Sequence, residues 1–308
     1  MRFKRLAVVA IGAGLAFSLA ACGSNNTNNT TPATTPTDTS TGASTEPTAA
    51  ATVDYSKDVG IVLSDASQPR WVMAQAQFQA AMPGAQIKFS NNDTAVEKTN
   101  VESFISAGVK VIIYNSIDGA AAAAATDEAA AAGIKVIAYD RLIMNTANVA
   151  YYVTFDSVQV GVAQGKYLAD QATANGGTGL NLYLFAGDTG DNNAFLFFQG
   201  AWSQLQPLIA NGTFNVVNSP QATQLASTAT LTHDQENTIM APITTKWDPT
   251  VAKQLAEAAI GQATADQKGT VYVLAPNDQT SQQITDAFRA AGVGTMYSTG
   301  QDLALASV

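Results

Sequence analysis

The sequence predicts an α/β protein built as two doubly wound lobes, each a parallel sheet with helices on both faces. Short apolar runs rich in β-branched and aromatic residues recur along the chain, as the strands of buried parallel sheets do. A segment of helical character follows almost every run, and this alternation favours parallel strands joined by crossover helices. The alternation continues on both sides of Asp156, so the chain holds enough strand–helix units for two lobes.

Eight apolar runs are the candidate strands, and seven stretches between them are the candidate helices. The strands cover residues 59–64, 86–90, 109–115, 134–139, 151–155, 180–186, 214–217 and 270–275. The helices cover residues 70–82, 94–107, 119–132, 158–174, 194–210, 249–265 and 279–291. Gly108, Gly133 and Gly292 each follow a candidate helix, where a left-handed glycine commonly ends one. The Ala-rich run at 120–125 lies between two strands, which favours a crossover helix over a low-complexity segment.

The first part of the chain predicts export and a tether rather than a folded domain. Residues 1–21 carry a basic start and an apolar run too short to span a bilayer, which is typical of a signal peptide. Residues 22–53 are dominated by Asn, Thr, Ser, Pro and Ala, so burial of apolar surface cannot offset the entropy of ordering them. We therefore expect a disordered tether there, a first lobe at 54–156 and a second lobe at 157–308.

Cys22 follows Leu19, Ala20 and Ala21, and a cysteine after small residues at this point resembles a bacterial lipobox. The resemblance implies cleavage before Cys22 and attachment of lipid to its sulfur. Acyl chains would then hold the protein at the outer face of the cytoplasmic membrane. The alternative is a plain signal peptide with an incidental cysteine, which would leave the protein periplasmic.

Composition excludes several classes of function. The chain has one Cys and one His, so an intrachain disulfide is impossible and zinc sites built from Cys and His are absent. A formal net charge of −9 with 15 Lys and Arg makes nucleic-acid binding a poor prediction. The glycine pairs at 12–14 and 292–294 lie in the signal peptide and after a helix, so neither fits a nucleotide-binding loop. We therefore expect no enzyme activity, no cofactor and no metal site.

Polar side chains collect where the predicted strands end. The positions are Ser64-Asp65, Asn91 to Asp93, Asn115-Ser116, Asp140-Arg141, Asp156, Asp188 to Asn193 and Asn277-Asp278. Open α/β sheets bind ligands beyond the carboxyl ends of their strands. Helix capping by Asx and Ser accounts for most of these positions, but not for Arg70 and Arg141, whose guanidinium groups only donate. The pattern therefore indicates a small-molecule site in addition to helix caps.

Seven motifs, in order along the chain, resemble one family. They are Gln68 to Trp71, Ile117 to Gly119, the stretch 136–165, Gly187 to Ala194, Lys246 to Pro249, Pro276 to Asp278 and Gly300 to Asp302. Together they resemble the xylose- and galactose-type monosaccharide-binding proteins of ABC importers, within the ribose-binding-like group of receptors. The resemblance runs from about residue 55 to the end of the chain. It implies the type I periplasmic-binding-protein architecture, in which a hinge joins two lobes and the sugar lies between them.

The resemblance also implies which residues bind the sugar. Carried over position by position, they are Arg70, Trp71, Asp140, Arg141, Asp191, Asn192, Trp247, Asn277 and Asp302. These residue types suit the ligand, because Asp, Asn and Arg can grip two neighbouring hydroxyls at once. An aromatic face suits the C–H face of a pyranose, and a few polar groups then fix its orientation.

Structural alternatives exist for several of these positions. Trp71 could be a core residue of a helix face, and Trp247 could be a hydrophobic staple before the helix that starts after Asp248. Asp140 and Arg141 could form a purely structural ion pair. Two polar residues outside the set have structural interpretations as well: we expect Asp156 to cap a helix near the hinge and His233 to lie on the surface.

The implied function is capture of a monosaccharide, of the xylose, glucose, galactose or arabinose class, outside the cytoplasm. Delivery would be to an ABC permease and through it to the ATPase subunit. We expect a monomer that binds no nucleic acid. One alternative is a sensor that presents its closed form to a membrane receptor. Another is an enzyme of the same architecture, which would need a nucleotide loop or an activated nucleophile.

The length of the chain carries a further expectation. In the family the chain continues for several elements after the segment that matches Gly300 to Asp302, whereas this sequence ends at Val308. We therefore expect an incomplete second lobe that lacks its last elements and the return crossing to the first lobe. A non-functional truncated fragment of a receptor is accordingly a third alternative.

Overall fold

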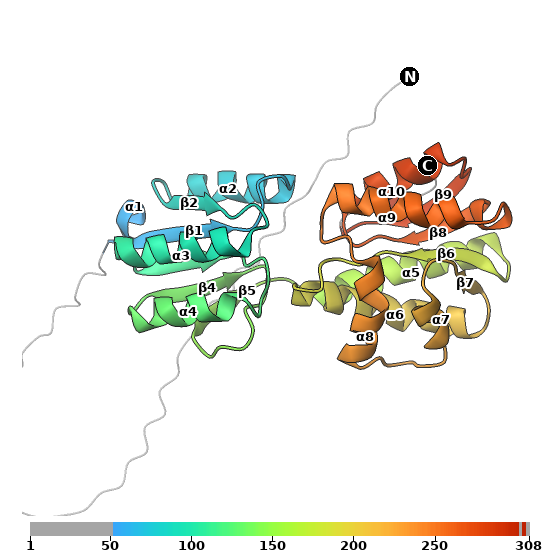
Figure 1. The fold of residues 1–308 in the computed structure, drawn as a ribbon, viewed down its shortest axis with the longest axis horizontal. Helices are drawn as coiled ribbons and strands as arrows, with labels where there is room; N and C mark the ends of the chain where they lie inside the picture. Colours follow the sequence, from blue (N-terminus) through green and yellow to red (C-terminus); the bar gives the residue numbers. More distant parts are fainter. Residues whose placement is uncertain (1–51, 302–303, 306–308) are drawn as a thin grey trace, which may run out of the picture. The chain divides into compact units, whose positions relative to one another are not determined.

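The computed structural model describes residues 52–301 and 304–305. They form two five-stranded sheets flanked by helices, which confirms the α/β class and the two doubly wound lobes (Figure 1). We use "first lobe" for the elements from α1 to β5 and "second lobe" for those from α5 to β10. The predicted signal peptide, tether and lipidated Cys22 lie outside the described residues, and so does Asp302. The expectation that the second lobe lacks its last elements stays a prediction.

The first sheet is parallel throughout, in the order β2-β1-β3-β4-β5. Its strands are β1 (Val59–Leu63), β2 (Gln86–Phe89), β3 (Val111–Tyr114), β4 (Lys135–Tyr139) and β5 (Val149–Val153). The short α1 (Tyr55–Asp58) precedes them, and the crossover helices are α2 (Pro69–Ala81), α3 (Thr94–Ala107) and α4 (Ala122–Ala131). β1 is buried along its length because strands flank it on both sides, whereas Tyr151 on the edge strand is 69% exposed.

The second sheet has the order β10-β9-β8-β6-β7. Four strands are parallel, namely β6 (Leu180–Leu184), β7 (Phe214–Val216), β8 (Thr270–Leu274) and β9 (Thr295–Thr299), and β10 (Ala304–Leu305) pairs antiparallel with β9. The helices are α5 (Ser157–Asn175), α6 (Asn192–Ala210), α7 (Pro220–Gln224), α8 (His233–Met240), α9 (Pro249–Gln262) and α10 (Asp278–Ala290). Short 3₁₀ turns lie at Ala241–Ile243 and Asp266–Lys268.

The predicted strands and helices are all present, with boundaries that differ by a few residues. Two helices differ from the prediction by three residues: α9 ends at Gln262 rather than at 265, and α4 begins at Ala122 rather than at 119. The start of α4 is delayed because the Asp118 carboxylate accepts hydrogen bonds from the amides of Ala120 and Ala121 at 2.8 Å each and so forms a turn first. Gly108, Gly133 and Gly292 have φ of 70°, 80° and 86°, which confirms the predicted helix ends.

Five helices and strands were not among the predicted runs: α1, α7, α8, β9 and β10. α7 has five residues, too few for a periodic pattern, and α8 lies in a stretch rich in polar residues. A capping box fixes the start of α8, because Thr232 and Gln235 each bond the other's backbone amide.

α5 and α6 cross at very close range, and this contact sets the position of the amino end of α6. A Cβ atom on Gly161 would lie 1.9 Å from the carbonyl oxygen of Phe197, and one on Gly200 would lie 2.1 Å from that of Val158. Only glycine lets the two backbones approach in this way.

Among the described residues, no helix is long and apolar enough to cross a membrane.

Candidate ligand-binding site

Seven of the nine predicted binding residues line one hollow between the carboxyl ends of strands from both sheets. They are Arg70, Trp71, Asp140, Arg141, Asp191, Trp247 and Asn277. Arg70 follows β1, Asp140 and Arg141 follow β4, and Asn277 follows β8, so the hollow lies where ligands bind in open α/β sheets. Asn192 does not line this hollow, and Asp302 lies outside the described residues.

Two ion pairs organise the hollow. The Arg70 guanidinium contacts the Asp140 carboxylate within the first lobe, and the Arg70 side chain is 44% exposed. Arg141 Nε lies 3.0 Å from Asp191 Oδ2 and joins the first lobe to the second, with both side chains buried. Burial raises the pKa of Asp191, while the neighbouring Arg141 charge opposes this shift. The positive and negative charges of these four side chains cancel, so the two ion pairs give the site no net charge.

The backbone of Asp140 is held in a strained conformation. Its φ is +66°, in the left-handed region that non-glycine residues rarely enter. Three side chains donate to its carbonyl oxygen: Thr154 Oγ1 at 2.9 Å, Asn193 Nδ2 at 3.0 Å and the Tyr152 hydroxyl at 3.2 Å. Such strain persists only where the surroundings over-determine it, and it concentrates at functional sites. A purely structural Asp140–Arg141 pair is not observed, because each residue pairs with a different partner.

Trp247 also has a positive φ, +56°, which is unusual for a bulky residue. Its ring lies against Gly187, where an added Cβ would come within 2.3 Å of two ring atoms, and it packs edge-on to Phe197 at 5.9 Å between ring centres. Its indole Nε1 is buried and has no hydrogen-bond partner among the described residues. A buried donor without a partner is costly, so this N–H is a candidate for a bond to a ligand oxygen.

Trp71 is buried and already uses its polar atom. Its Nε1 donates to Gln68 Oε1 at 3.1 Å, and its side chain packs edge-on to Tyr139. The guanidinium carbons of Arg70 and Arg141 lie 4.8 Å and 5.5 Å from its ring centre. Trp71 therefore combines the core packing given as its structural alternative with a position that holds both arginines by cation–π contact.

Five residues that line the hollow were not predicted from the sequence as binding residues: Gln68, Phe155, Asn193, Phe197 and Gln301. Asn193 lines the hollow, accepts from Ser157 Oγ at 2.9 Å and donates to the Asp140 carbonyl. The sugar contact of Asn192 stays a prediction. The sequence could have indicated Asn193, because Asp191 caps α6 and the residue two positions after this cap lines the same hollow. Phe155 and Phe197 carry no polar group, and their sequence pattern is that of core residues.

Two polar residues set aside from the site have the expected structural roles. Asp156 caps α5 through a bond from the Gln159 amide at 3.1 Å. His233 is exposed at the start of α8, with its ring 4.3 Å from that of Phe195. Within the described residues, no cluster of His, Cys, Asp or Glu could hold a metal ion.

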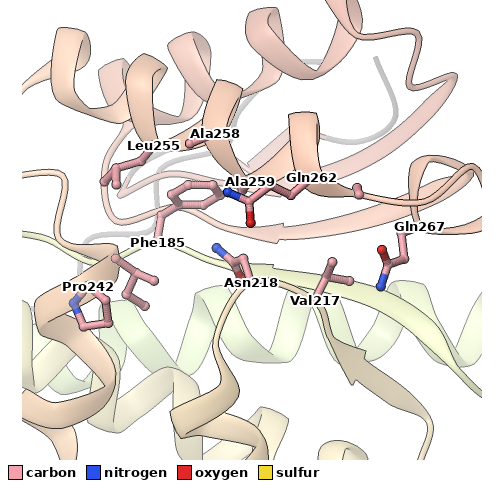
Figure 2. Close-up of a pocket in the computed structure, with 11 residues that line it drawn as sticks. Phe185, Val217, Asn218, Pro242, Leu255, Ala258, Ala259, Gln262 and Gln267 are labelled. Atoms are coloured by element: carbon pink, nitrogen blue, oxygen red, sulfur yellow. The ribbon is translucent and has the colours of Figure 1, made fainter.

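A second hollow of about 310 Å³ shares Arg70, Asn277 and Gln301 with the first and extends along α2 and the start of α10. Another hollow, of about 450 Å³, lies in the second lobe next to α9 (Figure 2). Its lining residues carry no formal charge, and Phe185, Leu255 and Pro242 contribute apolar surface to it. The hollow with the two ion pairs combines charged and polar side chains from both lobes, as expected of a specific small-molecule site.

The site is suited to a neutral ligand with several hydroxyl groups. Its arginines, asparagines and glutamines donate, its aspartates accept, and the charged groups balance one another. Hydrogen bonds that involve charged groups are the stronger kind. The rings of Trp247 and Phe197 supply an apolar wall beside them.

Comparison with known proteins places the chain in a family. Residues 59–308 match the model described as "Periplasmic binding protein domain". The chain is 34% identical to the multiple sugar-binding periplasmic receptor ChvE of Rhizobium radiobacter, over 81% of this chain and 69% of the relative. It is 31% identical to the D-xylose-binding periplasmic protein of Haemophilus influenzae, over 85% and 71%.

Solved structures agree. A carbohydrate transporter solute-binding protein from Chloroflexus aurantiacus, in complex with D-glucose, has a TM-score of 0.75 and 51% identity, over 79% of this chain and 72% of that one. An ABC transporter solute-binding protein from Clostridium phytofermentans with bound β-D-glucose has a TM-score of 0.66 and 30% identity, over the same shares. The chain therefore belongs to the periplasmic binding protein family, whose members bind solutes and are not enzymes.

Proposed function

We propose that this chain captures a monosaccharide, D-glucose or D-xylose first among those expected, in the hollow that Arg141 and Asp191 share. The observation that carries the proposal is the convergence of two ion pairs and an unpartnered indole N–H from both lobes on one hollow. The relatives support the choice of ligand, since they are described as multiple-sugar and D-xylose binders and two solved neighbours hold glucose.

The side chains suggest how the sugar is held. Asp140 and Asp191 accept from hydroxyls, Arg70, Arg141 and Asn277 donate to them, and Trp247 donates its indole N–H while its ring faces the C–H surface of the pyranose. Because these groups come from both lobes, the sugar completes contacts that neither lobe makes alone. Binding would then favour the closed arrangement of the lobes. Asp302, beside Gln301 in the sequence, remains a proposed contact.

The place of action follows from the same proposal. The signal peptide would export the protein, and lipid on Cys22 would keep it at the outer face of the cytoplasmic membrane, with the polar tether giving reach. The closed form would dock on an ABC permease and deliver the sugar for ATP-driven import. A sensor that shows the closed form to a membrane receptor is the second candidate, and sugar uptake in a deletion strain separates the two.

Calorimetry tests the sugar-binding part. The purified, folded chain is titrated with D-glucose, D-xylose, D-galactose and L-arabinose, and we expect binding heat with at least one of them. Arg141→Ala should weaken that binding at least tenfold, because it removes the positive charge that joins the two lobes and leaves the buried Asp191 carboxylate without its charged partner. Absence of heat with all four sugars would refute the proposal.

A further inference from the structure

A buried carboxylate, outside the lining of the hollow, is connected to the proposed sugar site through the backbone. Glu97 is in the first turn of α3 and is 3% exposed. Its Oε1 accepts a bond from the hydroxyl of the buried Tyr114, and its Oε2 accepts from the backbone amide of Ile117 at 2.8 Å. Glu97 does not line the hollow, so it makes no direct contact with a sugar there.

The peptide bond between Ser116 and Ile117 connects Glu97 to the site. While its N–H donates to Glu97, its C=O accepts from Arg141 Nη1 at 3.1 Å. The described chain contains no cis peptide, so these two groups point in opposite directions. One peptide dipole is thereby aligned between a carboxylate at its positive end and a guanidinium at its negative end.

We infer that Glu97 is a positioning residue for sugar binding, which orients Arg141 toward Asp191 through the Ser116–Ile117 peptide. The inference rests on the proposed function in that Arg141 is taken to bind the sugar. Ionised Glu97 strengthens both hydrogen bonds of the peptide, because hydrogen bonds in such a chain polarise one another. Protonated Glu97 must use its proton as a donor, and its hold on the Ile117 amide weakens.

The charges around Glu97 make this control sensitive to pH. Burial raises its pKa to about 7, and the Tyr114 hydroxyl, the Ile117 amide and the Arg141 charge oppose that rise, while Asp118 adds to it. Asp191, which faces Arg141 from the second lobe, also has a raised pKa. A change in sugar affinity near neutral pH could therefore arise from either carboxyl, and a variant of Glu97 alone is needed to separate them.

Glu97→Gln is the informative variant, because glutamine can accept from the Ile117 amide and donate to the Tyr114 oxygen without a charge. We expect the wild-type dissociation constant for D-glucose to fall as the pH rises from 5.5 to 8.5. Glu97→Gln should bind about tenfold more weakly than wild type at pH 8.5 and should lose most of the pH dependence. Equal affinities of the two proteins across the range would overturn the inference.

Glu236→Gln is the matched control. Glu236 is a second buried glutamate whose pKa burial raises to about 7, but it lies on α8 and does not line the hollow. This variant should keep the wild-type affinity and the wild-type pH profile. If it behaves like Glu97→Gln, the effect comes from charge in general and the inference fails.

A second measurement does not depend on sugar. The ¹³C carboxyl resonance of Glu97, assigned by its loss in Glu97→Gln, reports its titration midpoint, and Arg141→Gln should shift that midpoint upward because a favourable positive charge is lost. An unchanged midpoint overturns the inference. Tyr114→Phe should raise the midpoint as well and replaces Glu97→Gln if that variant does not fold. If wild type binds no sugar at any pH, the proposed function fails, and this titration then decides only whether Glu97 is coupled to Arg141.

Discussion

Asp140 and Trp247 show that the site is held by strain as well as by attraction. Each has a positive φ in a position where the side chain faces the hollow, and such backbone costs about 1–3 kcal/mol per residue. The three hydrogen bonds to the Asp140 carbonyl keep it in place. The strain fixes the direction of the carboxylate before a ligand arrives, which reduces the cost of binding.

A pair of substitutions at Asp140 separates strain from charge. Asn tolerates the left-handed region and Ala does not, while both remove the charge that pairs with Arg70. We expect both variants to lose sugar affinity to a similar extent, and Asp140→Ala to be about 1 kcal/mol less stable than Asp140→Asn in urea unfolding. Equal stability of the two variants would mean that the φ of +66° carries no cost here.

Gly187 provides the test for Trp247. A Cβ at this position would come within 2.3 Å of the indole ring, so Gly187→Ala must displace Trp247 from its place in the hollow. We expect calorimetry to show at least a tenfold loss of sugar affinity. The change in indole fluorescence that accompanies sugar binding should also be lost. Gly261→Ala is the control, because nothing lies within 4 Å of a Cβ there. It should leave affinity unchanged and stabilise α9 by about 0.5–1 kcal/mol.

Among the contacts between elements, the α5–α6 crossing leaves the least room for any side chain larger than glycine. The amino end of α6 carries Asp191 and Asn193, so any shift of this helix moves two groups of the site. Gly161→Ala would place a Cβ 1.9 Å from the Phe197 carbonyl oxygen, where only backbone movement can relieve the clash. We expect a loss of about 2–4 kcal/mol in the free energy of unfolding. A variant with wild-type stability and wild-type affinity would show that the helices separate freely.

Elements were predictable from the sequence where the pattern was long and regular. The alternation of apolar runs and helical stretches gave the eight predicted strands and their crossover helices, because short runs rich in β-branched and aromatic residues differ from helices in length and composition. α7 was missed because five residues cannot show a helical period, and α8 because its surface is mostly polar. Sequence reasoning therefore located the strand ends well and the short connections between them poorly.

The residues that line the hollow were predictable only in part. Arg70 and Arg141 stood out because helix capping does not account for side chains that only donate, whereas Asp191 was indicated by the resemblance to the sugar-binding family. Phe155 and Phe197 could not be separated from core residues, since an apolar side chain looks the same in a core and in a binding wall. The choice between Asn192 and Asn193 depended on the exact helix start, which a cap residue fixes only to within a position or two.

For the whole molecule, burial of acids controls the dependence of stability on pH. Burial raises the pKa values of Glu97 and Glu236 to about 7 from the ordinary value of 4.5, and that of Asp191 to about 6 from 3.8. A carboxyl with a higher pKa in the folded state binds more protons there than in the unfolded state at every pH between the two values. The free energy of unfolding should therefore be largest at mildly acidic pH and fall as the pH rises from about 4.5 to about 7.

The exposed carboxyls of Asp54, Asp58 and Asp127 act in the opposite direction, because their hydrogen-bond partners lower their pKa values below 3.8. Their effect on stability is therefore confined to more acidic solutions.

Urea unfolding at pH 5, 6, 7 and 8 can therefore isolate the buried acids. Wild type should lose roughly 1–3 kcal/mol between pH 5 and pH 8 through Glu97. The double variant Glu97→Gln, Glu236→Gln should show a much flatter profile and should be the more stable protein at pH 8. A double variant that falls as steeply as wild type would show that other groups carry the dependence. If the sugar-affinity profile and the stability profile respond to Glu97 in opposite directions, this one carboxylate lowers stability at neutral pH while it orients Arg141 for binding.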